Sequence, residues 1–158
     1  MNRDAGERTP HSPGDLLQEL LPLIETLAQR AGCRLEVRVD DKLPALQVDA
    51  LRIQHVIFTL VQNAIEAAAA GDSPAVSIQA TSDRYNVEIS VSDSGPGVPQ
   101  AARDQIFRPF FTTKAHGTGL GLASSRAIVE AHEGTIGFDD VAAGGTRFWI
   151  RLPVTSRS

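Results

Sequence analysis

The chain has 158 residues, of which 42% are hydrophobic and 22% charged, with a formal net charge of -4 at pH 7. This length suits one domain with a buried core, and the acidic balance argues against a general nucleic-acid binder, which usually carries a basic surface. No apolar run approaches the roughly 18 residues needed to cross a bilayer, and no secretory signal pattern opens the chain. The single cysteine, Cys33, excludes an internal disulfide and is typical of a reducing compartment, so we expect a cytoplasmic domain, even if its parent protein is membrane-anchored.

Residues 1–14 are polar and rich in proline, glycine and charge, which predicts a frayed end or the remnant of a linker. Asp15 is a candidate N-cap for a first helix that ends at Gly32. Pro22 falls inside the apolar pattern of this helix, so we expect a kink or a restart there. Residues 34–39 alternate as a half-buried strand does.

A second helix follows, with Asp49 as its cap and an apolar stripe that repeats about every 3.6 residues as far as Ala70. Residues 75–80 and 86–91 then alternate between apolar and polar side chains. Because polar turn residues separate the two runs, this segment predicts an antiparallel hairpin.

The C-terminal half predicts a helical turn, a third long helix and two closing strands. In chain order these are residues 101–107, 119–132, 135–138 and 147–152. Helices on one face of a mixed, mainly antiparallel sheet make an α+β two-layer sandwich. We expect the domain to span residues 15–153, followed by a short tail at 154–158.

Three glycines, Gly117, Gly119 and Gly121, alternate immediately before the third helix. Helix propensity does not explain them, since each glycine costs about 1 kcal/mol inside a helix. A glycine-rich turn that opens a helix offers bare N–H groups and the positive end of the helix dipole, both of which suit phosphate. The alternative is a flexible loop ahead of a helix.

Asp93 ends the second strand of the hairpin and precedes a turn that contains Gly95 and Gly97. Its carboxylate can accept a hydrogen bond from an exocyclic amine, and the glycines permit close approach by a flat ring. The alternative is an ordinary turn.

Asn63 lies on the apolar-rich second helix, where its amide oxygen can coordinate a hard cation that also holds phosphate oxygens. Glu66 lies three residues further on roughly the same face and can join through water. The alternative is a satisfied buried amide. The sequence contains no P-loop, no motif of the Ser/Thr/Tyr kinases, no hydrolase nucleophile elbow and no metal-ligand spacing among its four histidines.

Together and in this order, the motifs resemble those of the ATP-binding catalytic domain of two-component sensor histidine kinases. This domain belongs to the wider family that includes DNA gyrase B, the Hsp90 chaperones and MutL. Asn63-Ala64 resembles the N box of that domain, residues 93–97 the G1 box and residues 107–114 the F box. Residues 117–122 resemble the G2 box, and residues 144–148 resemble the last box. The resemblance covers residues 15–153 and is greatest to the nitrogen-regulation and oxygen-sensing branch.

The resemblance implies that three helices cover one side of the sheet and that ATP lies between a helix and a lid. It implies that Asn63 holds Mg²⁺ bridging the phosphates and that Asp93 accepts from the adenine amino group, in a pocket shaped by Gly95 and Gly97. Thr146 would support adenine directly or through water. It implies Asn63 and Lys114 as the catalytic residues and a short lid over residues 113–121. The other implied nucleotide contacts are Glu66, Ala67, Val98, Thr113, Lys114, Gly117, Thr118, Gly119, Leu120, Gly121 and Leu122.

The chain departs from the family pattern at two positions of the second helix. The family usually carries a second asparagine four residues before the metal ligand, and its hydrolytic members carry a glutamate there; this chain has Thr59. Because threonine is no general base, we expect slow ATP hydrolysis and favour phosphoryl transfer. Glu66 occupies a position where many sensor kinases of other branches carry a lysine.

The acceptor histidine of such kinases lies on a separate helical hairpin, in a motif that no histidine of this chain fits. The resemblance therefore implies an excised, monomeric catalytic domain that binds ATP without labelling itself, from a homodimeric parent. The expected partners are the phosphoacceptor hairpin and the receiver domain of a response regulator, with no nucleic acid. The alternatives are an ATP-driven machine of the gyrase or Hsp90 kind, an anti-sigma-type serine kinase, and a regulatory module without catalysis.

Overall fold

The computed structural model describes residues 7–109, 111 and 121–154. In these residues a five-stranded sheet has the strand order β2-β4-β5-β7-β6. Its strands are β2 (Arg34–Val39), β4 (Ala75–Ser82), β5 (Asn86–Asp93), β6 (Thr135–Asp140) and β7 (Thr146–Pro153). All its neighbours are antiparallel except β2 and β4, which run parallel.

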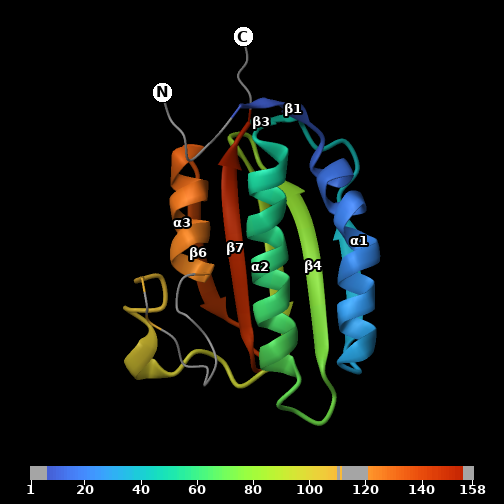
Figure 1. Ribbon diagram of the computed structural model, residues 1–158, viewed down its shortest axis with the longest axis vertical. Helices are drawn as coiled ribbons and strands as arrows, with labels where there is room; N and C mark the ends of the chain where they lie inside the picture. The colour runs from blue at the N-terminus through green and yellow to red at the C-terminus, as the bar shows by residue number, and fades with distance from the viewer. Residues whose placement is uncertain (1–6, 110, 112–120, 155–158) are drawn as a thin grey trace.

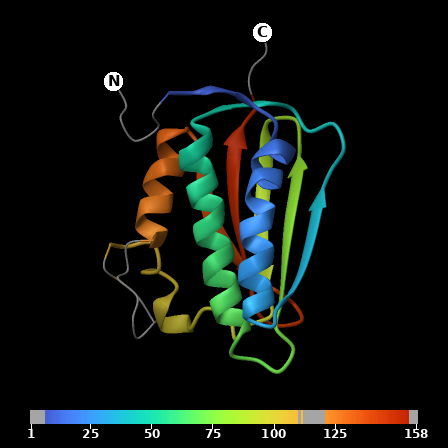
Figure 2. The same ribbon diagram turned by 45° about the vertical axis from the view of Figure 1, so that its right-hand side comes forward.

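Three helices of the described chain cover one face of this sheet, as Figures 1 and 2 show. They are α1 (Pro13–Arg30), α2 (Ala50–Ala68) and α3 (Gly121–Ala131). Helix α2 lies in the middle, and its fully buried stripe includes Ile53, Ile57 and Leu60, which repeat at the helical period against the sheet. The predicted α+β two-layer sandwich is therefore confirmed, and so are the hairpin and the cap of α2 at Asp49, whose carboxylate accepts from the backbone N–H of Arg52.

The first helix begins earlier than the sequence pattern predicts. Ser12 is its N-cap and accepts from the backbone N–H of Asp15 at 3.3 Å, so the prediction of Asp15 as the cap is wrong. Of the kink or restart expected at Pro22, the restart is absent: one helix runs through the proline, with buried leucines before it and Ile24 after it packed on one core. The helix ends at Arg30 with Ala31 as its C-cap, and Gly32 follows, as predicted for the C-terminal end, with a φ of +64° that favours glycine.

The N-terminal segment carries a strand where the sequence pattern predicts a frayed end. β1 (Thr9–His11) pairs antiparallel with β3 (Leu46–Val48), and the two lie together at one end of the molecule (Figure 1). Arg8 forms an ion pair of 2.9 Å with Glu133 and also donates to the carbonyl of Ala131 at the end of α3. Strands of three residues are too short for a clear alternation, so neither β1 nor β3 is predicted from the sequence.

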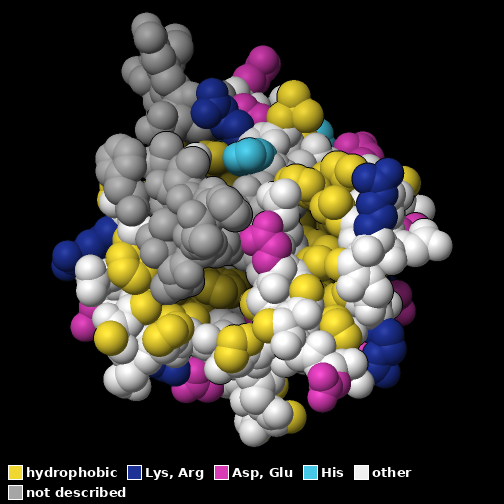
Figure 3. Space-filling view, turned by 60° about the horizontal axis from the view of Figure 1, so that its bottom comes forward, with side chains coloured by type: hydrophobic (Ala, Val, Ile, Leu, Met, Phe, Trp, Pro, Cys, Tyr) yellow, Lys and Arg dark blue, Asp and Glu magenta, His cyan; other side chains and the backbone are white. Residues whose placement is uncertain are grey.

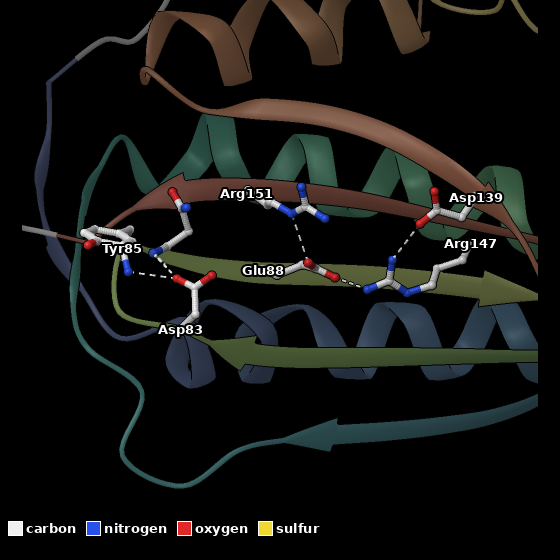
Figure 4. A network of polar contacts seen from close by, with 7 residues as sticks. Asp83, Tyr85, Glu88, Asp139, Arg147 and Arg151 are labelled. Carbon is white, nitrogen blue, oxygen red and sulfur yellow. Dashed lines mark hydrogen bonds and ion pairs between the residues drawn. The ribbon is translucent and has the colours of Figure 1, made fainter.

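The opposite face of the sheet is polar (Figure 4). Glu88 on β5 accepts from Arg147 and, at 3.0 Å, from Arg151, while Arg147 also donates to Asp139 at 3.2 Å. At the β4–β5 turn, Asp83 accepts from the backbone N–H groups of Asn86 and Tyr85, which lowers the pKa of its carboxyl. Because these charged side chains are solvated, this face of the sheet does not need a helix packed on it.

No helix in the described ranges is both long and apolar enough to span a bilayer.

Candidate nucleotide site

The candidate site is centred on Asp93, the last residue of β5, which is only 6% exposed. Its Oδ1 accepts from the backbone N–H groups of Gly95 at 2.8 Å and Thr146 at 3.4 Å. No donor among the described residues reaches Oδ2. Burial raises the pKa of this carboxyl, and the two N–H groups oppose the rise. Asp93 is therefore a buried acceptor with one oxygen left for a ligand.

Two glycines hold neighbouring segments tightly around Asp93. A Cβ on Gly145, in the β6–β7 turn, would lie 1.9 Å from the carbonyl oxygen of Asp93. A Cβ on Gly95 would lie 2.7 Å from the carbonyl oxygen of Ala67 on α2. The absent side chain of Gly95 therefore lets the turn pack on α2, a role different from the ring contact that the sequence suggests. Gly97 has a φ of +88°, which a turn residue with a side chain rarely adopts.

A cavity of about 140 Å³ opens beside Asp93. Seven of the residues predicted from the sequence line it: Asn63, Ala67, Asp93, Gly97, Val98, Leu122 and Thr146. The sequence prediction omitted three apolar lining residues, Pro99, Ile106 and Phe148, although Phe148 lies in the last motif. The space-filling view of this end of the molecule shows hydrophobic side chains gathered around a hollow (Figure 3). An apolar cavity with one carboxylate suits a flat ring that carries an amine.

Helix α2 supplies the polar group at the other side of the cavity. Asn63 is half-buried and lines the cavity one turn before Ala67, whereas Glu66 is exposed and lies outside the lining. Thr59, one turn earlier, is buried, and its Cγ2 would be 3.3 Å from a Cβ on Gly121. The first turn of α3 therefore rests on α2 next to the cavity.

Six of the predicted site residues lie outside the described residues: Thr113, Lys114, Gly117, Thr118, Gly119 and Leu120. Their assignments as lid, lysine contact and phosphate cradle remain predictions.

The protein donors at the cavity suit a cation that is held mainly by the phosphates of a bound nucleotide. Among the described residues no three His, Cys, Asp or Glu side chains gather as a metal site. Asn63 offers one hard oxygen donor beside the cavity. Mg²⁺ is commonly bound in this manner, by one or two protein oxygens together with phosphates and water.

A second, shallower groove of about 460 Å³ lies at the same end of the sheet and shares only Asp93 with the first cavity. Strand residues such as Arg34, Glu36, Ser77 and Ser92 border it. It is larger but more open to solvent, and its described lining includes no residue of α2 or α3, so we assign the ligand to the smaller cavity.

The fold and this site define an α+β domain that binds a nucleotide. Residues 48–156 match the family of histidine kinase-, DNA gyrase B- and HSP90-like ATPases. The chain is 42% identical over 134 residues to the sensor histidine kinase ZraS of Escherichia coli O157:H7, covering 83% of this chain and 29% of that protein. It thus spans less than a third of the length of this curated relative.

Solved structures agree with the sequence match. The catalytic domain of the histidine kinase ThkA superposes with a TM-score of 0.84 at 34% identity, covering 93% of this chain and 95% of that domain. ThkA in complex with the response regulator protein TrrA superposes with a TM-score of 0.80 at 30% identity, covering 94% of this chain and 42% of that one. The chain therefore belongs to the histidine kinase-, DNA gyrase B- and HSP90-like ATPase family, as an ATP-binding catalytic domain of the histidine kinase type.

Proposed function

We propose that this domain binds Mg-ATP in the Asp93 cavity and transfers the γ-phosphoryl group to a histidine on a separate helical hairpin of its parent protein. The observation that carries the proposal is the buried carboxylate of Asp93, whose Oδ2 accepts from no donor in the described part of the chain, in an apolar cavity that Asn63 also lines. The exocyclic amine of adenine would donate to Oδ2, while Val98, Ile106 and Leu122 enclose the ring.

The phosphates would extend from the cavity past Asn63 toward α3. Mg²⁺, when bound, would neutralise phosphate charge, and Asn63 is the protein residue we assign to it. Lys114 and the amides of residues 117–122 are the proposed phosphate contacts. Thr113 and Thr118 would belong to the lid.

Phosphoryl transfer is favoured over hydrolysis by the composition of the cavity wall. Asp93 is the only carboxylate among the described lining residues, and its Oδ1 is held by two backbone N–H groups at the base end. Thr59 cannot activate water as a base. In the proposed step the bond between the γ-phosphorus and the bridging oxygen breaks, a phosphorus–nitrogen bond forms on the histidine, ADP leaves and the imidazole loses a proton.

The proposed partners are the phosphoacceptor and dimerisation hairpin of the parent protein and a response regulator receiver domain, whose aspartate would then take the phosphate. The complex of ThkA with a response regulator protein supports this kind of partner. We propose a homodimeric parent with this domain in the cytoplasm, and a monomeric isolated domain without a nucleic-acid ligand.

The test mixes this chain with radiolabelled Mg-ATP and isolated histidine hairpins of related sensor kinases. We expect acid-labile, alkali-stable phosphate on a hairpin and none on the chain itself. Asp93→Asn should remove the label. Label on a serine of a partner protein would instead identify a serine kinase, and ATP bound without any transfer would identify a regulatory module.

A further inference from the structure

The wall of the cavity opposite α2 is built from a segment with little regular structure. Residues 98–107 contain one short 3-10 helix, η1 (Gln100–Ala102), yet Val98, Pro99 and Ile106 from this segment line the cavity. The backbone hydrogen bonds within it are local turns, such as those from Ala102 to Pro99 and from Gln105 to Ala102, so side-chain contacts must tie this segment to the sheet.

Arg103 supplies such contacts from the middle of the segment. Its Nη2 lies 2.5 Å from Oδ1 of Asp140, the last residue of β6, and the carbon at the centre of its guanidinium lies 5.6 Å from the centroid of the Phe138 ring. Its Nε is buried and has no hydrogen-bond partner in the described part of the chain. Removing this N–H from water has a cost, which the ion pair and the ring contact must offset.

The ring beneath Arg103 belongs to an aromatic cluster that reaches the cavity. This cluster consists of Phe107, Phe138 and Phe148. The centroids of Phe138 and Phe148 are 5.7 Å apart, and Phe107 meets Phe148 edge-on at 6.3 Å. Because Phe148 lines the cavity, two rings in turn, Phe138 and Phe148, connect Arg103 to the ligand space.

We propose that Arg103 is a positioning residue for the base end of the nucleotide site. By bridging Asp140 and the aromatic cluster, it holds residues 98–107 against β6 and β7 and sets the distance between Ile106 and the carboxylate of Asp93. Arg103 itself does not line the cavity. The inference rests on the proposed nucleotide site.

The test measures ADP and ATP binding to this chain by calorimetry, each with Mg²⁺ and with EDTA. Arg103→Ala should weaken all four affinities by the same factor, about tenfold, because the contact acts at the base end that both nucleotides share. Asp140→Asn, which keeps the arginine over Phe138, should weaken them about two- to threefold. Arg103→Lys keeps the charge but loses the flat group, and should fall between these two variants.

The matched control is Arg38→Ala, which removes an arginine from an exposed ion pair with Glu36 on β2, away from the cavity lining. Its nucleotide affinities should equal those of the unaltered chain. If Arg103→Ala does not fold, the affinities of Asp140→Asn and Arg103→Lys decide the question. The side chain of Asp140 is 62% exposed, so Asp140→Asn should fold.

Three results would overturn the role of Arg103: folded Arg103 and Asp140 variants with unchanged affinities, an equal loss in Arg38→Ala, or a loss for ATP without a loss for ADP. An unaltered chain that binds neither nucleotide would overturn the proposed function itself, together with this inference. Binding by the unaltered chain therefore separates the two failures.

Discussion

The backbone of Gly145 lies against the backbone of Asp93, so close that a Cβ on the glycine would be 1.9 Å from the aspartate carbonyl oxygen. Real Cβ atoms never approach a backbone oxygen so closely. The contact brings Thr146 beside the carboxylate, where its backbone N–H donates to Oδ1. The β6–β7 turn and the end of β5 therefore form one rigid corner of the site.

This corner predicts unequal effects for two neighbouring substitutions. Gly144 and Gly145 have nearly the same φ, +107° and +105°, but a Cβ on Gly144 meets nothing within 4 Å. Gly144→Ala should lower the free energy of unfolding by about 1–3 kcal/mol through backbone strain alone. Gly145→Ala should cost at least about 2 kcal/mol more, because it adds a clash with Asp93. Urea denaturation of both variants measures the difference; equal losses would show that the corner yields easily.

Asp93→Asn should separate binding from stability. The substitution removes the charge that would attract the adenine amine, and we expect ATP affinity to fall more than tenfold, about 1.4 kcal/mol or more, by calorimetry. An amide oxygen can still accept from the backbone N–H groups of Gly95 and Thr146, so the fold should persist. Unchanged ATP affinity in the folded variant would contradict the assigned role of the carboxylate.

The pH dependence of that variant checks the burial of Asp93. Because burial raises the pKa of this carboxyl, the folded chain holds its proton to a higher pH than the unfolded chain. Ionisation therefore destabilises the folded state as pH rises above 3.8, the ordinary value, through the raised pKa. Asp93→Asn should be at least as stable as the unaltered chain at pH 7, and this advantage should disappear near pH 4. This account is refuted if the stability of Asp93→Asn, measured relative to that of the unaltered chain, is lower at pH 7 than at pH 4.

Asn63→Asp should abolish Mg²⁺-dependent transfer to a supplied histidine hairpin while leaving the chain folded. The added charge near the phosphates alters a site we assign to one neutral oxygen donor. Transfer assays with labelled ATP measure the loss, and circular dichroism checks the fold. Gln62→Glu, which adds the same charge at an exposed position of the same helix outside the cavity lining, is the control and should retain most of the activity. Transfer at the unaltered rate by Asn63→Asp would remove this residue from the proposed metal site.

The buried imidazole of His132 should make the folded chain less stable in mild acid. The residue is 2% exposed. Its Nδ1 donates to the carbonyl of Ile128 at 2.8 Å, and its Nε2 accepts from the backbone N–H of Asp49 at 3.0 Å. Burial lowers the pKa of this imidazole below 6.5, so between the lowered pKa and 6.5 the unfolded chain binds a proton that the folded chain does not. The free energy of unfolding should therefore fall as pH decreases below about 6.5.

Urea denaturation between pH 7.5 and 5 measures this slope, taking about pH 6.5 as its upper bound. His132→Gln should be less stable at pH 7 and should lose the part of the slope due to the imidazole. His55 is exposed on α2, so His55→Gln should keep the slope. An identical pH profile in His132→Gln would show that other groups produce it.

Local patterns predicted most elements, but not their exact ends. The cap at Asp49 and the left-handed Gly32 follow from short-range chemistry, and both are confirmed. The start of α1 differs because Ser12 and Pro13 form a better helix start than Asp15. The strands β1 and β3 are not predicted from the sequence, because their pairing joins two three-residue segments far apart in the chain.

The sequence by itself determined the α+β class, the family resemblance and the identity of most cavity residues, because helical period, strand alternation and motif spacing are local properties of the chain. Only the tertiary structure decided which atoms meet. Asp93 and Thr146 lie 53 positions apart, and no local rule places the backbone N–H of one on the carboxylate of the other. The same holds for Arg103 and Asp140, since long-range contacts arise only when separate segments pack on one core.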